Sequence, residues 1–443
     1  MYTIFIFRRD YRTFDNIGLN YAITHFKHII PIFIFTPEQI KKNLYFSNNS
    51  VQFLCESLEE LRNDIPLHIF YGDNIKVLKQ IHDTIKISNI IFNQDYTPYS
   101  RERDKQIELW CNQNEIKCIM TEDYLLNPIG TFNKKDTNPY VVFTPFKNNA
   151  VKLTIPRPKK VETKHLIWKK ELESIKYYRH DMNYYKKNKD NNVKGGRKLG
   201  LIQMRIPVNY EEKDQLFIET TQLSAYIKYG CLSIREVYHF FKDDDIKTQL
   251  IWREFYYYIN YYHPKLLESS KSFQSKYDKI KWVHNIKHLE MWKNGMTGYP
   301  VVDACMKQLN TTGYMHNRGR LIVSNFLNRL LGLDWRLGEL YFAQKLIDYD
   351  PCVNSGNWQW IASVGVDTKP SNQRIFNPWL QSKRFDADCA YIKYWIPELK
   401  NIPINEIHRW DLHFNKYDIS YPKPIIDYSE SREKSLQMYL LNT

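Results

Sequence analysis

Long hydrophobic runs are absent from this 443-residue sequence. No window of about 18 consecutive apolar residues occurs, so the sequence predicts no transmembrane helix. Residues 1–10 lack the basic start and the cleavage site of a signal peptide, and they fit a first strand better. The seven cysteines show neither a CxxC pair nor zinc-ligand spacing, which argues against a disulfide scaffold and against a metal site. We therefore expect a soluble, intracellular protein of the cytoplasm or nucleus, with reduced thiols and no bound metal.

The glycine-rich dinucleotide fingerprint GxGxxG is also absent after the first predicted strand, so we place no nucleotide cofactor there. In this region, runs rich in β-branched and aromatic residues alternate with helical patterns. Strands are predicted at 3–6, 29–35, 68–72, 89–93 and 116–120, and helices at 50–63, 74–83 and 98–112, with a further helix capped by Asp15. The alternation predicts a Rossmann-like α/β domain over residues 1–125, in which a parallel sheet is covered on both faces.

The rest of the sequence divides into a connector and a helical region. Residues 126–206 have little periodicity, and their basic stretch 186–198 is predicted to be an exposed loop or disordered. Helical spacing continues from 207 to 443, which predicts a larger all-α domain. The net charge of +14 favours a polyanionic partner, with DNA as the first candidate, although nucleotide bias in the gene would produce the same lysine-rich composition.

Residues 297–386 carry the densest chemical pattern. Their apolar spacing predicts a helix, a turn at Gly332 and a second helix. Arg320 is expected to pair with Asp348, because a lone buried charge is very costly. Taken singly, such charges and the tryptophans beside them are usually structural. Their combination with an amide and several indoles suits a bound planar aromatic cofactor better than a plain core.

Several motifs in this stretch resemble one family. They are TGYP, VVDA, MKQL, TTGYMHNRGR, LDWRLGE, DYDPCVNSGNWQW, RIFNP and the FD at 385–386. Together they closely resemble the DNA photolyase/cryptochrome family, which binds FAD in a U shape inside a helical domain. FRRDYRTFDN at 7–16 resembles the opening signature of the same family. The resemblance implies FAD as cofactor, damaged DNA as partner and a monomeric protein. The resemblance also leaves open whether a second, light-harvesting chromophore is bound, which would be a folate or a deazaflavin.

The resemblance implies that FAD is held by residues from several segments. Thr220, Thr221 and Ser224 lie in the segment that holds the pyrophosphate in relatives, although ordinary helix capping would also explain hydroxyls there. Gln222 stands where relatives often have arginine. The implied FAD-binding residues are Tyr210, Thr220, Thr221, Gln222, Leu223, Ser224, Gln249, Trp252, Arg253, Asn317, Arg320, Asp348, Asp350 and Asn354.

The resemblance also implies catalytic and DNA-binding residues. Trp282, Trp335 and Trp358 match the chain of tryptophans that passes electrons to the flavin, and Asn354 matches the residue beside its N5 atom. Trp252 and Trp360 would stack on a pyrimidine dimer flipped out of the duplex. The implied DNA-binding residues are Gln249, Trp252, Asn317, Arg318, Trp360 and Gln381.

Differences within the family bear on the lesion. (6-4) photolyases carry adjacent histidines, whereas Asn317 follows His316 here. DASH cryptochromes usually replace the second tryptophan of NWQW by tyrosine, whereas Trp360 is retained; Gln249, in place of the usual glutamate, is DASH-like. We therefore expect a light-driven lyase for cyclobutane pyrimidine dimers, most like class I and acting on duplex DNA.

Three alternatives remain open. One is a DASH-type or (6-4)-type lesion preference. Another is a cryptochrome-type blue-light photoreceptor, although the long C-terminal extension and the altered residue facing N5 that are common in sensors are not expected here. The last is a DNA-binding protein without catalysis, for which the basic composition alone would be sufficient.

Overall fold

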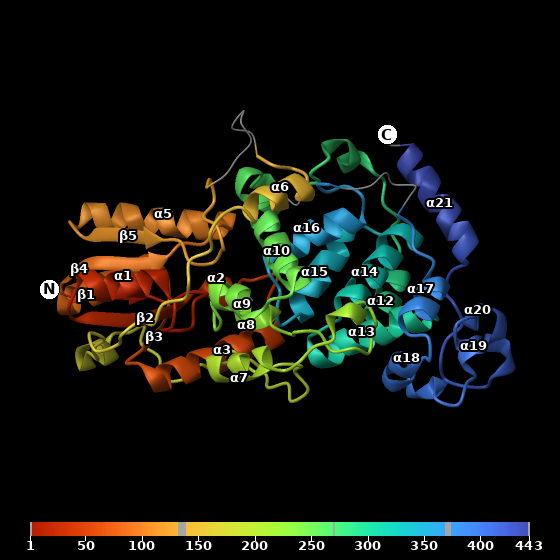
Figure 1. The fold of residues 1–443 in the computed structure, drawn as a ribbon, viewed down its shortest axis with the longest axis horizontal. Helices are drawn as coiled ribbons and strands as arrows, with labels where there is room; N and C mark the ends of the chain where they lie inside the picture. Colours follow the sequence, from red (N-terminus) through yellow and green to blue (C-terminus); the bar gives the residue numbers. More distant parts are fainter. Residues whose placement is uncertain (1, 132–138, 269–270, 368–373, 442–443) are drawn as a thin grey trace. The chain divides into compact units, whose positions relative to one another are not determined.

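A five-stranded parallel sheet opens the chain. The computed structural model describes residues 2–131, 139–268, 271–367 and 374–441, and Figure 1 labels its elements. The strands are β1 (Tyr2–Ile6), β2 (Ile29–Phe35), β3 (His68–Tyr71), β4 (Ile87–Asn93) and β5 (Lys117–Thr121). All neighbours pair in parallel, in the order β3-β2-β1-β4-β5. The predicted α/β sheet is confirmed.

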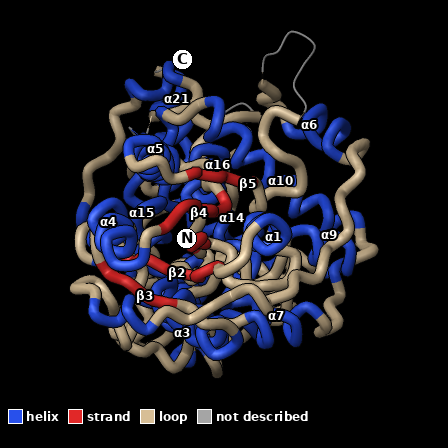
Figure 2. The backbone as a smooth tube through the Cα atoms, turned by 90° about the vertical axis from the view of Figure 1, so that its left-hand side faces the viewer, coloured by secondary structure: helices blue, strands red, loops and turns tan. Residues whose placement is uncertain are grey.

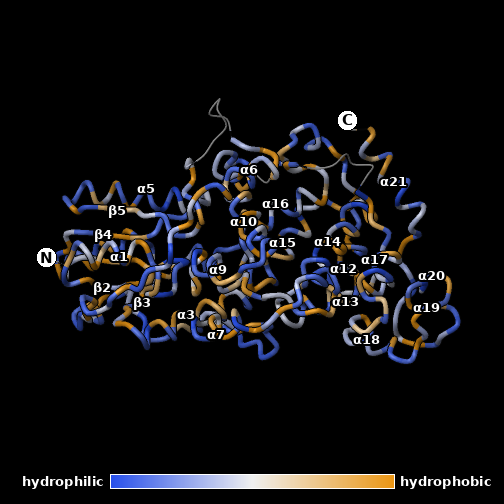
Figure 3. Tube along the Cα trace, in the orientation of Figure 1, coloured by the Kyte–Doolittle hydropathy of each residue, from blue (hydrophilic) through white to orange (hydrophobic). Residues whose placement is uncertain are grey.

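Helices cover both faces of this sheet. The longer helices that connect its strands are α1 (Ile17–His25), α3 (Asn48–Asp64), α4 (Asn74–Ile85) and α5 (Pro98–Gln113). Figure 2 shows α1 on one face and α4 with α5 on the other. Coverage on two faces explains why every residue of β2 is buried. The hydropathy colouring agrees, because β2 is largely hydrophobic and α5 mostly hydrophilic (Figure 3).

One predicted helix cap is wrong. Asn16, not Asp15, caps α1, and its side chain accepts a hydrogen bond from the backbone N–H of Leu19. Asp15 has a φ of 52° instead, and its carboxylate is bonded to Ser233 and Arg235. A partner more than 200 residues away therefore decided the role of Asp15, which local sequence could not reveal.

The chain forms two compact units, each described here by itself. The first unit contains Met1–Lys187, Val193–Ile206 and Gln222–Leu267, and the second contains Asn188–Asn192, Pro207–Thr221 and Glu268–Thr443. Besides the sheet and its helices, the first unit holds α2 (Pro37–Ile40), α6 (Phe143–Ala150), α7 (Arg197–Met204), α8 (Ser224–Lys228), α9 (Ile234–Phe240) and α10 (Asp244–Tyr262). The short α11 (Lys265–Glu268) spans the boundary.

Side-chain bonds explain why residues 222–267 belong with the sheet. Arg235 on α9 contacts Asp15 and Asp123, and Glu254 on α10 accepts from the backbone N–H groups of Leu126 and Asn127. These units cut the chain at other places than the predicted domains 1–125, 126–206 and 207–443. Those domain boundaries stay a prediction, since packing units need not coincide with domains. Within the predicted connector, residues 132–138 lie outside the described residues.

The basic stretch 186–198 is more ordered than predicted. Gly195 donates its N–H to the Glu56 carboxylate at 2.7 Å, and Gly196 donates to the Ser57 hydroxyl at 3.0 Å. A Cβ on Gly195 would lie 2.2 Å from the carbonyl oxygen of Phe53. The two glycines therefore allow this segment to pack tightly on α3, a tertiary contact that a composition of lysine and asparagine does not indicate.

In the described part of the second unit, all regular secondary structure is helical. Its helices are α12 (Ile286–Lys293), α13 (Pro300–Thr312), α14 (Asn317–Asn325), α15 (Trp335–Lys345), α16 (Pro351–Ile361), α17 (Pro378–Phe385), α18 (Ala390–Trp395), α19 (Ile404–Ile407), α20 (Trp410–His413) and α21 (Tyr428–Leu440). A π-helical segment, Phe326–Leu330, extends α14, and Gly332, with a φ of 65°, makes the predicted turn before α15. The predicted helix, turn and helix are confirmed, as is the all-α class of this region.

Within the described residues, no helix is long and apolar enough to cross a membrane. All seven cysteines are free thiols. No cluster of three or more His, Cys, Asp or Glu side chains suitable for a metal ion occurs in the part of the chain that the structure describes.

Candidate functional site

The predicted cofactor residues are divided between the two units. Gln222, Leu223, Ser224, Gln249, Trp252 and Arg253 belong to the first unit, whereas Tyr210, Thr220, Thr221, Asn317, Arg320, Asp348, Asp350 and Asn354 belong to the second. Each set is described within its own unit.

The predicted ion pair is present in the second unit. Arg320 on α14 donates from Nη2 to Asp348 Oδ2 at 2.9 Å and from Nε to the carbonyl oxygen of Met315 at 2.8 Å. The Asp348 side chain is only 8% exposed, whereas that of Arg320 is 27% exposed. The guanidinium therefore neutralises a buried carboxylate and still presents part of its charge to a ligand or to solvent.

Arg318 lies two residues before Arg320 and has different partners. It forms an ion pair with Asp214 at 2.7 Å, and its guanidinium carbon lies 4.2 Å from the ring centre of Phe385. Its neighbour Asn317 is exposed at the start of α14. His316 caps that helix, and burial lowers its pKa to about 4, so the ring is neutral at physiological pH.

Asn354 on α16 has a fixed orientation. Its Nδ2 donates to Glu339 Oε1 at 2.9 Å and to the carbonyl oxygen of Glu339 at 3.1 Å. An amide nitrogen has two hydrogens, so both are used. The Oδ1 atom of Asn354 is thus the atom that can accept a hydrogen bond from a ligand. We predicted an amide beside a flavin, and Glu339 is the residue that orients it.

Glu339 itself is buried on α15. Burial raises its pKa to about 7 by disfavouring the charged form, although hydrogen bonds from Asn354 and Tyr349 lower it. The folded protein therefore keeps this proton to a higher pH than the unfolded chain, which releases it near the ordinary value of 4.5. It follows that the contribution of Glu339 to stability falls as pH rises from about 4.5 to about 7.

Glu339→Gln should remove this pH dependence while keeping the bond from Asn354. When the pH is raised from 5 to 8, the free energy of unfolding should fall in both proteins. We expect this fall to be smaller in the variant than in the unchanged protein by about 2–3 kcal/mol. Urea unfolding of the FAD-loaded protein at the two pH values measures the difference. Glu433→Gln, at an exposed position on α21, is the control. Equal pH dependence in both variants would show that Glu339 does not titrate in this range.

Asp350 also has a structural bond. Its Oδ1 accepts from the backbone N–H of Cys352 at 3.1 Å and of Val353 at 3.3 Å, which caps α16. The FAD contact that the family resemblance implies for Asp350 would therefore share this carboxylate with the helix start. A negative group at a helix N-terminus is stabilised by the helix dipole.

The segment predicted to hold phosphate does not cap its helix through a side chain. Leu223 is the N-cap of α8 and makes no side-chain bond, and Gln222 has a φ of 50°. Ser224, the first residue of α8, is exposed. In the second unit, the Thr220 hydroxyl lies 3.1 Å from the Tyr314 hydroxyl. Thr221 and Tyr210 are both partly buried.

Helix α10 carries the predicted residues Gln249, Trp252 and Arg253. Gln249 is exposed, and Trp252 is partly exposed. Arg253 donates from Nη1 to the carbonyl oxygen of Tyr124 at 2.7 Å, and its guanidinium carbon lies 4.7 Å from the ring centre of Tyr257. Within its own unit, Arg253 thus holds α10 against the end of the sheet. Any contact with a phosphate would be additional.

The three predicted electron-transfer tryptophans differ in burial. Trp335 and Trp358 are 2% and 3% exposed, whereas Trp282 is partly exposed and meets Tyr439 edge-on, with ring centres 6.3 Å apart. Trp358 packs against Phe342 and Trp292, at centre distances of 5.0 and 6.3 Å. Among the described residues, no direct ring contact joins the three predicted tryptophans to one another. Any transfer between them would have to cross intervening atoms.

The remaining predicted DNA-binding residues lie in the second unit. Trp360 on α16 is partly exposed, and the guanidinium carbon of Arg374 lies 3.3 Å from its ring centre. Arg374 also donates to the Trp360 carbonyl oxygen at 2.8 Å. Gln381 on α17 has a buried Oε1 atom for which the described residues offer no hydrogen-bond donor.

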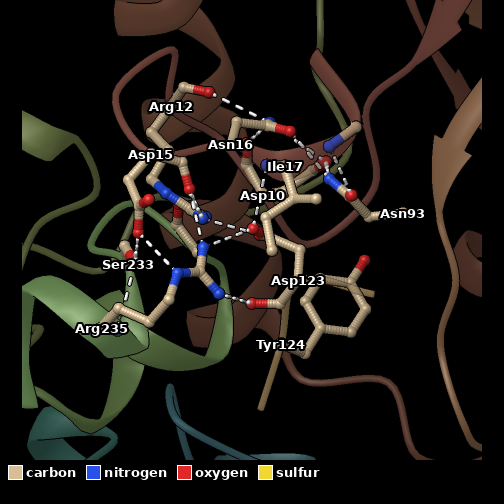
Figure 4. A network of polar contacts seen from close by, with 12 residues as sticks. Asp10, Arg12, Asp15, Asn16, Ile17, Asn93, Asp123, Tyr124, Ser233 and Arg235 are labelled. Atoms are coloured by element: carbon tan, nitrogen blue, oxygen red, sulfur yellow. Dashed lines mark hydrogen bonds and ion pairs between the residues drawn. The ribbon is translucent and has the colours of Figure 1, made fainter. Parts of the chain in front are cut away.

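A polar network at the carboxyl ends of the strands ties the first unit together (Figure 4). Asp123, which follows β5, accepts from Arg12 at 2.7 Å and from Arg235 at 2.8 Å. Burial by itself would raise the pKa of Asp123, but the two guanidinium groups hold it below its usual value. Asp10, bonded to Asn93 at 2.5 Å, has its pKa raised to about 6 by burial. The opening signature at 7–16 thus joins the sheet to α9.

Two family models match the chain. The model described as DNA photolyase matches residues 3–164, and the model described as the FAD binding domain of DNA photolyase matches residues 246–440. The deoxyribodipyrimidine photo-lyase of Buchnera aphidicola is 34% identical to this chain, over 98% of the chain and 95% of the relative. This chain belongs to the DNA photolyase family.

Solved structures of photolyases are similar to this chain over its whole length. The archaeal photolyase from Sulfolobus tokodaii, whose crystal structure contains two FAD molecules, has a TM-score of 0.91 and 36% identity over 100% of both chains. A cryptochrome from Synechocystis has a TM-score of 0.90 over 99% of both chains, but at 24% identity this likeness shows the fold alone. The FAD-binding domain confirms FAD as the predicted cofactor.

The donors and acceptors of this photolyase are chemically suited to FAD. Arg320 offers a cation, Asp348 and Asp350 offer carboxylates, and Asn354 offers a fixed amide oxygen. The hydroxyls at 220, 221 and 224 offer neutral donors. A phosphate prefers cations and hydroxyls, and the N–H groups of an isoalloxazine ring prefer carboxylate or amide oxygens. The role of each residue stays a prediction.

The sequence analysis did not single out several buried charges, among them Glu339, Glu254 and Arg329, which are at most 7% exposed. Each lies in a helix whose apolar spacing surrounds it, and a charge at such a position is the signal that could have found them. Glu254 is held by Leu126 and Asn127, and the guanidinium carbon of Arg329 lies 3.8 Å from the ring centre of Tyr439.

Proposed function

We propose that this chain is a deoxyribodipyrimidine photo-lyase that uses light to split cyclobutane pyrimidine dimers in DNA. The observation that carries the proposal is the family match over residues 3–164 and 246–440, together with relatives of that name that are similar over nearly their whole length. The charge of +14 fits a DNA substrate, since lysine and arginine side chains would hold its phosphates.

The chain's own residues bind and orient. Arg320, paired with Asp348, would hold a phosphate or the ring edge of FAD, and Asn354 would present its Oδ1 to a ring N–H. Bound FAD in its reduced form would supply the electron that opens the dimer after light is absorbed. Trp252 and Trp360 would stack on the flipped dimer and keep water away from it.

Trp282, Trp335 and Trp358 would carry electrons from the surface towards the cofactor. The burial order supports this direction, because Trp282 is partly exposed and the other two are buried. Indole suits the task because it is a large and readily oxidised ring. Three further points stay expectations from the sequence. They are a second chromophore (a folate or a deazaflavin), a monomeric state, and a location in the cytoplasm or nucleus.

A repair assay tests the proposed function. FAD-reduced protein is mixed with a duplex oligonucleotide that contains one cyclobutane dimer and illuminated with blue light, and restored bases are counted by chromatography. We expect repair in light and none in the dark. A duplex with a (6-4) lesion should stay unrepaired. Intact dimers after illumination of fully reduced protein would contradict the proposal and favour a photoreceptor.

Trp282→Phe separates electron supply from repair. We expect light-driven reduction of oxidised FAD to slow by about tenfold or more, equivalent to at least about 1.4 kcal/mol in the barrier, because phenylalanine is much harder to oxidise. Repair by chemically pre-reduced protein should keep its rate. Trp395→Phe, at a partly exposed tryptophan outside the proposed chain, is the control. Equal loss in both assays would assign Trp282 to packing instead.

A further inference from the structure

One ring contact of Trp252, on α10 in the first unit, is very close. The ring of Phe143, at the start of α6, lies parallel to the indole of Trp252, with 3.4 Å between ring centres and 6° between planes. Phe255 meets both rings edge-on, Phe143 at 5.7 Å and 74° and Trp252 at 5.8 Å and 80°. The Phe143 ring thus lies directly against one face of the indole.

Burial distinguishes the two rings of this stack. Phe143 is 7% exposed, whereas Trp252 is partly exposed. Phe255, which touches both rings, is fully buried. Tyr256, one turn further along α10, lies 5.8 Å from the indole at 29°. Trp252 thus keeps part of its surface exposed although Phe143, Phe255 and Tyr256 all lie against it.

A second aromatic residue of α6 fixes this helix. Phe146 is fully buried and packs on Phe255 at 5.2 Å and on Tyr258 at 5.1 Å. Directly superposed rings are electrostatically less favourable than offset or edge-on pairs. The surrounding packing must therefore impose the parallel arrangement of Phe143 and Trp252, and Phe255, which touches both rings, supplies part of that packing.

We propose that Phe143 is a positioning residue for lesion recognition, because its ring backs the indole of Trp252 and holds it in the plane on which a flipped pyrimidine stacks. The inference rests on the proposed function, in which Trp252 stacks on the dimer. Stacking of a base on an aromatic platform contributes to binding. That contribution requires a platform whose orientation is already fixed, since ordering a loose side chain would consume part of it.

Binding measurements on matched variants test the inference. Phe143→Leu removes the flat ring and keeps an apolar side chain, and Phe146→Leu makes the same change three residues away, where the ring does not touch Trp252. Affinity is measured for a dimer-containing duplex and for the same undamaged duplex. We expect Phe143→Leu to reduce the ratio of the two affinities by about three- to tenfold. Phe146→Leu should leave the ratio unchanged, even if it lowers the melting temperature as much.

Rescue and a double variant exclude a merely structural role. Phe143→Tyr keeps a flat ring and should retain the affinity ratio. In a Trp252→Leu background, Phe143→Leu should cause no further loss, because the platform it supports is gone. Should Phe143→Leu not fold, Phe143→Met, which also lacks a flat ring, takes its place with the same expected result.

The outcomes separate the inference from the proposed function. An unchanged ratio in Phe143→Leu, together with a reduced ratio in Trp252→Leu, would overturn the role of Phe143 alone. An equal drop in the ratio for Phe143→Leu and Phe146→Leu would also overturn it, because general packing would then explain both. If Trp252→Leu itself leaves the ratio unchanged, the stacking role of Trp252 fails, while the light-dependent repair assay still decides the proposed function.

Discussion

Replacing Asp123 by asparagine should lower the free energy of unfolding by about 3–5 kcal/mol. Asp123 accepts from Arg12 and from Arg235, and the three side chains are 0%, 2% and 4% exposed. Asparagine is neutral, so it would leave the buried guanidinium of Arg12 without its paired carboxylate, and Arg235 would keep only its ion pair with Asp15. An unbalanced buried charge is far more costly than an intact ion network is stabilising.

Chemical denaturation of the FAD-loaded protein at neutral pH measures this loss. Asp64→Asn, at a carboxylate whose side chain is 49% exposed, is the matched control and should change stability by no more than about 0.5 kcal/mol. A loss at Asp123 as small as that at Asp64 would show that water or a nearby carboxylate, such as Asp15, replaces the missing charge. The network would then tolerate the loss of a buried charge, contrary to the expectation from its burial.

Gly338→Ala should destabilise the second unit and displace a tryptophan of the proposed electron path. A Cβ at this position in α15 would lie 2.1 Å from Cη2 and 2.5 Å from Cζ3 of Trp358, and 2.7 Å from Cδ2 of Leu327. An indole is rigid, so either the ring or the helix must move. We expect a loss of about 1–3 kcal/mol in unfolding free energy, despite the better helix propensity of alanine.

The displaced ring should also affect photochemistry. Light-driven reduction of oxidised FAD should slow by several-fold, because electron transfer depends steeply on the distance between rings, whereas repair by pre-reduced protein should change less. Gly319→Ala is the control within α14, where the new Cβ would meet the flexible side chains of Cys305 and Met315 at 2.9 and 3.1 Å. Equal effects at Gly319 and Gly338 would show that Trp358 adapts as easily as those side chains.

Much of the first unit was predictable because its signals are local. The strand at 29–35 was predicted with the bounds of β2, and the predicted helix at 98–112 ends one residue before α5 does. Periodicity and β-branched composition depend on neighbours in the chain, so they suffice for such elements. The role of Asp15 was not predictable, since its partners Ser233 and Arg235 come from a distant helix.

The candidate site was predictable only in part, for the same reason. The pairing of Arg320 with Asp348 followed from the cost of burying either charge alone, and it is present at 2.9 Å. The orientation of Asn354 depends on Glu339, which the spacing of α15 alone did not single out. The stack of Phe143 on Trp252 joins two helices about 100 residues apart in the chain, and no local pattern predicts an interplanar angle.

The family, the parallel sheet, the helical remainder and the cofactor all follow from the amino-acid sequence, because motifs and periodicity are written along the chain. Which side chain orients which depends on tertiary packing: Glu339 holds the amide of Asn354, Phe143 stacks on Trp252, and two arginines keep Asp123 ionised. These relations depend on distances between residues far apart in sequence. Burial makes these relations specific, because a polar group that is removed from water must find its hydrogen-bond partner inside the protein.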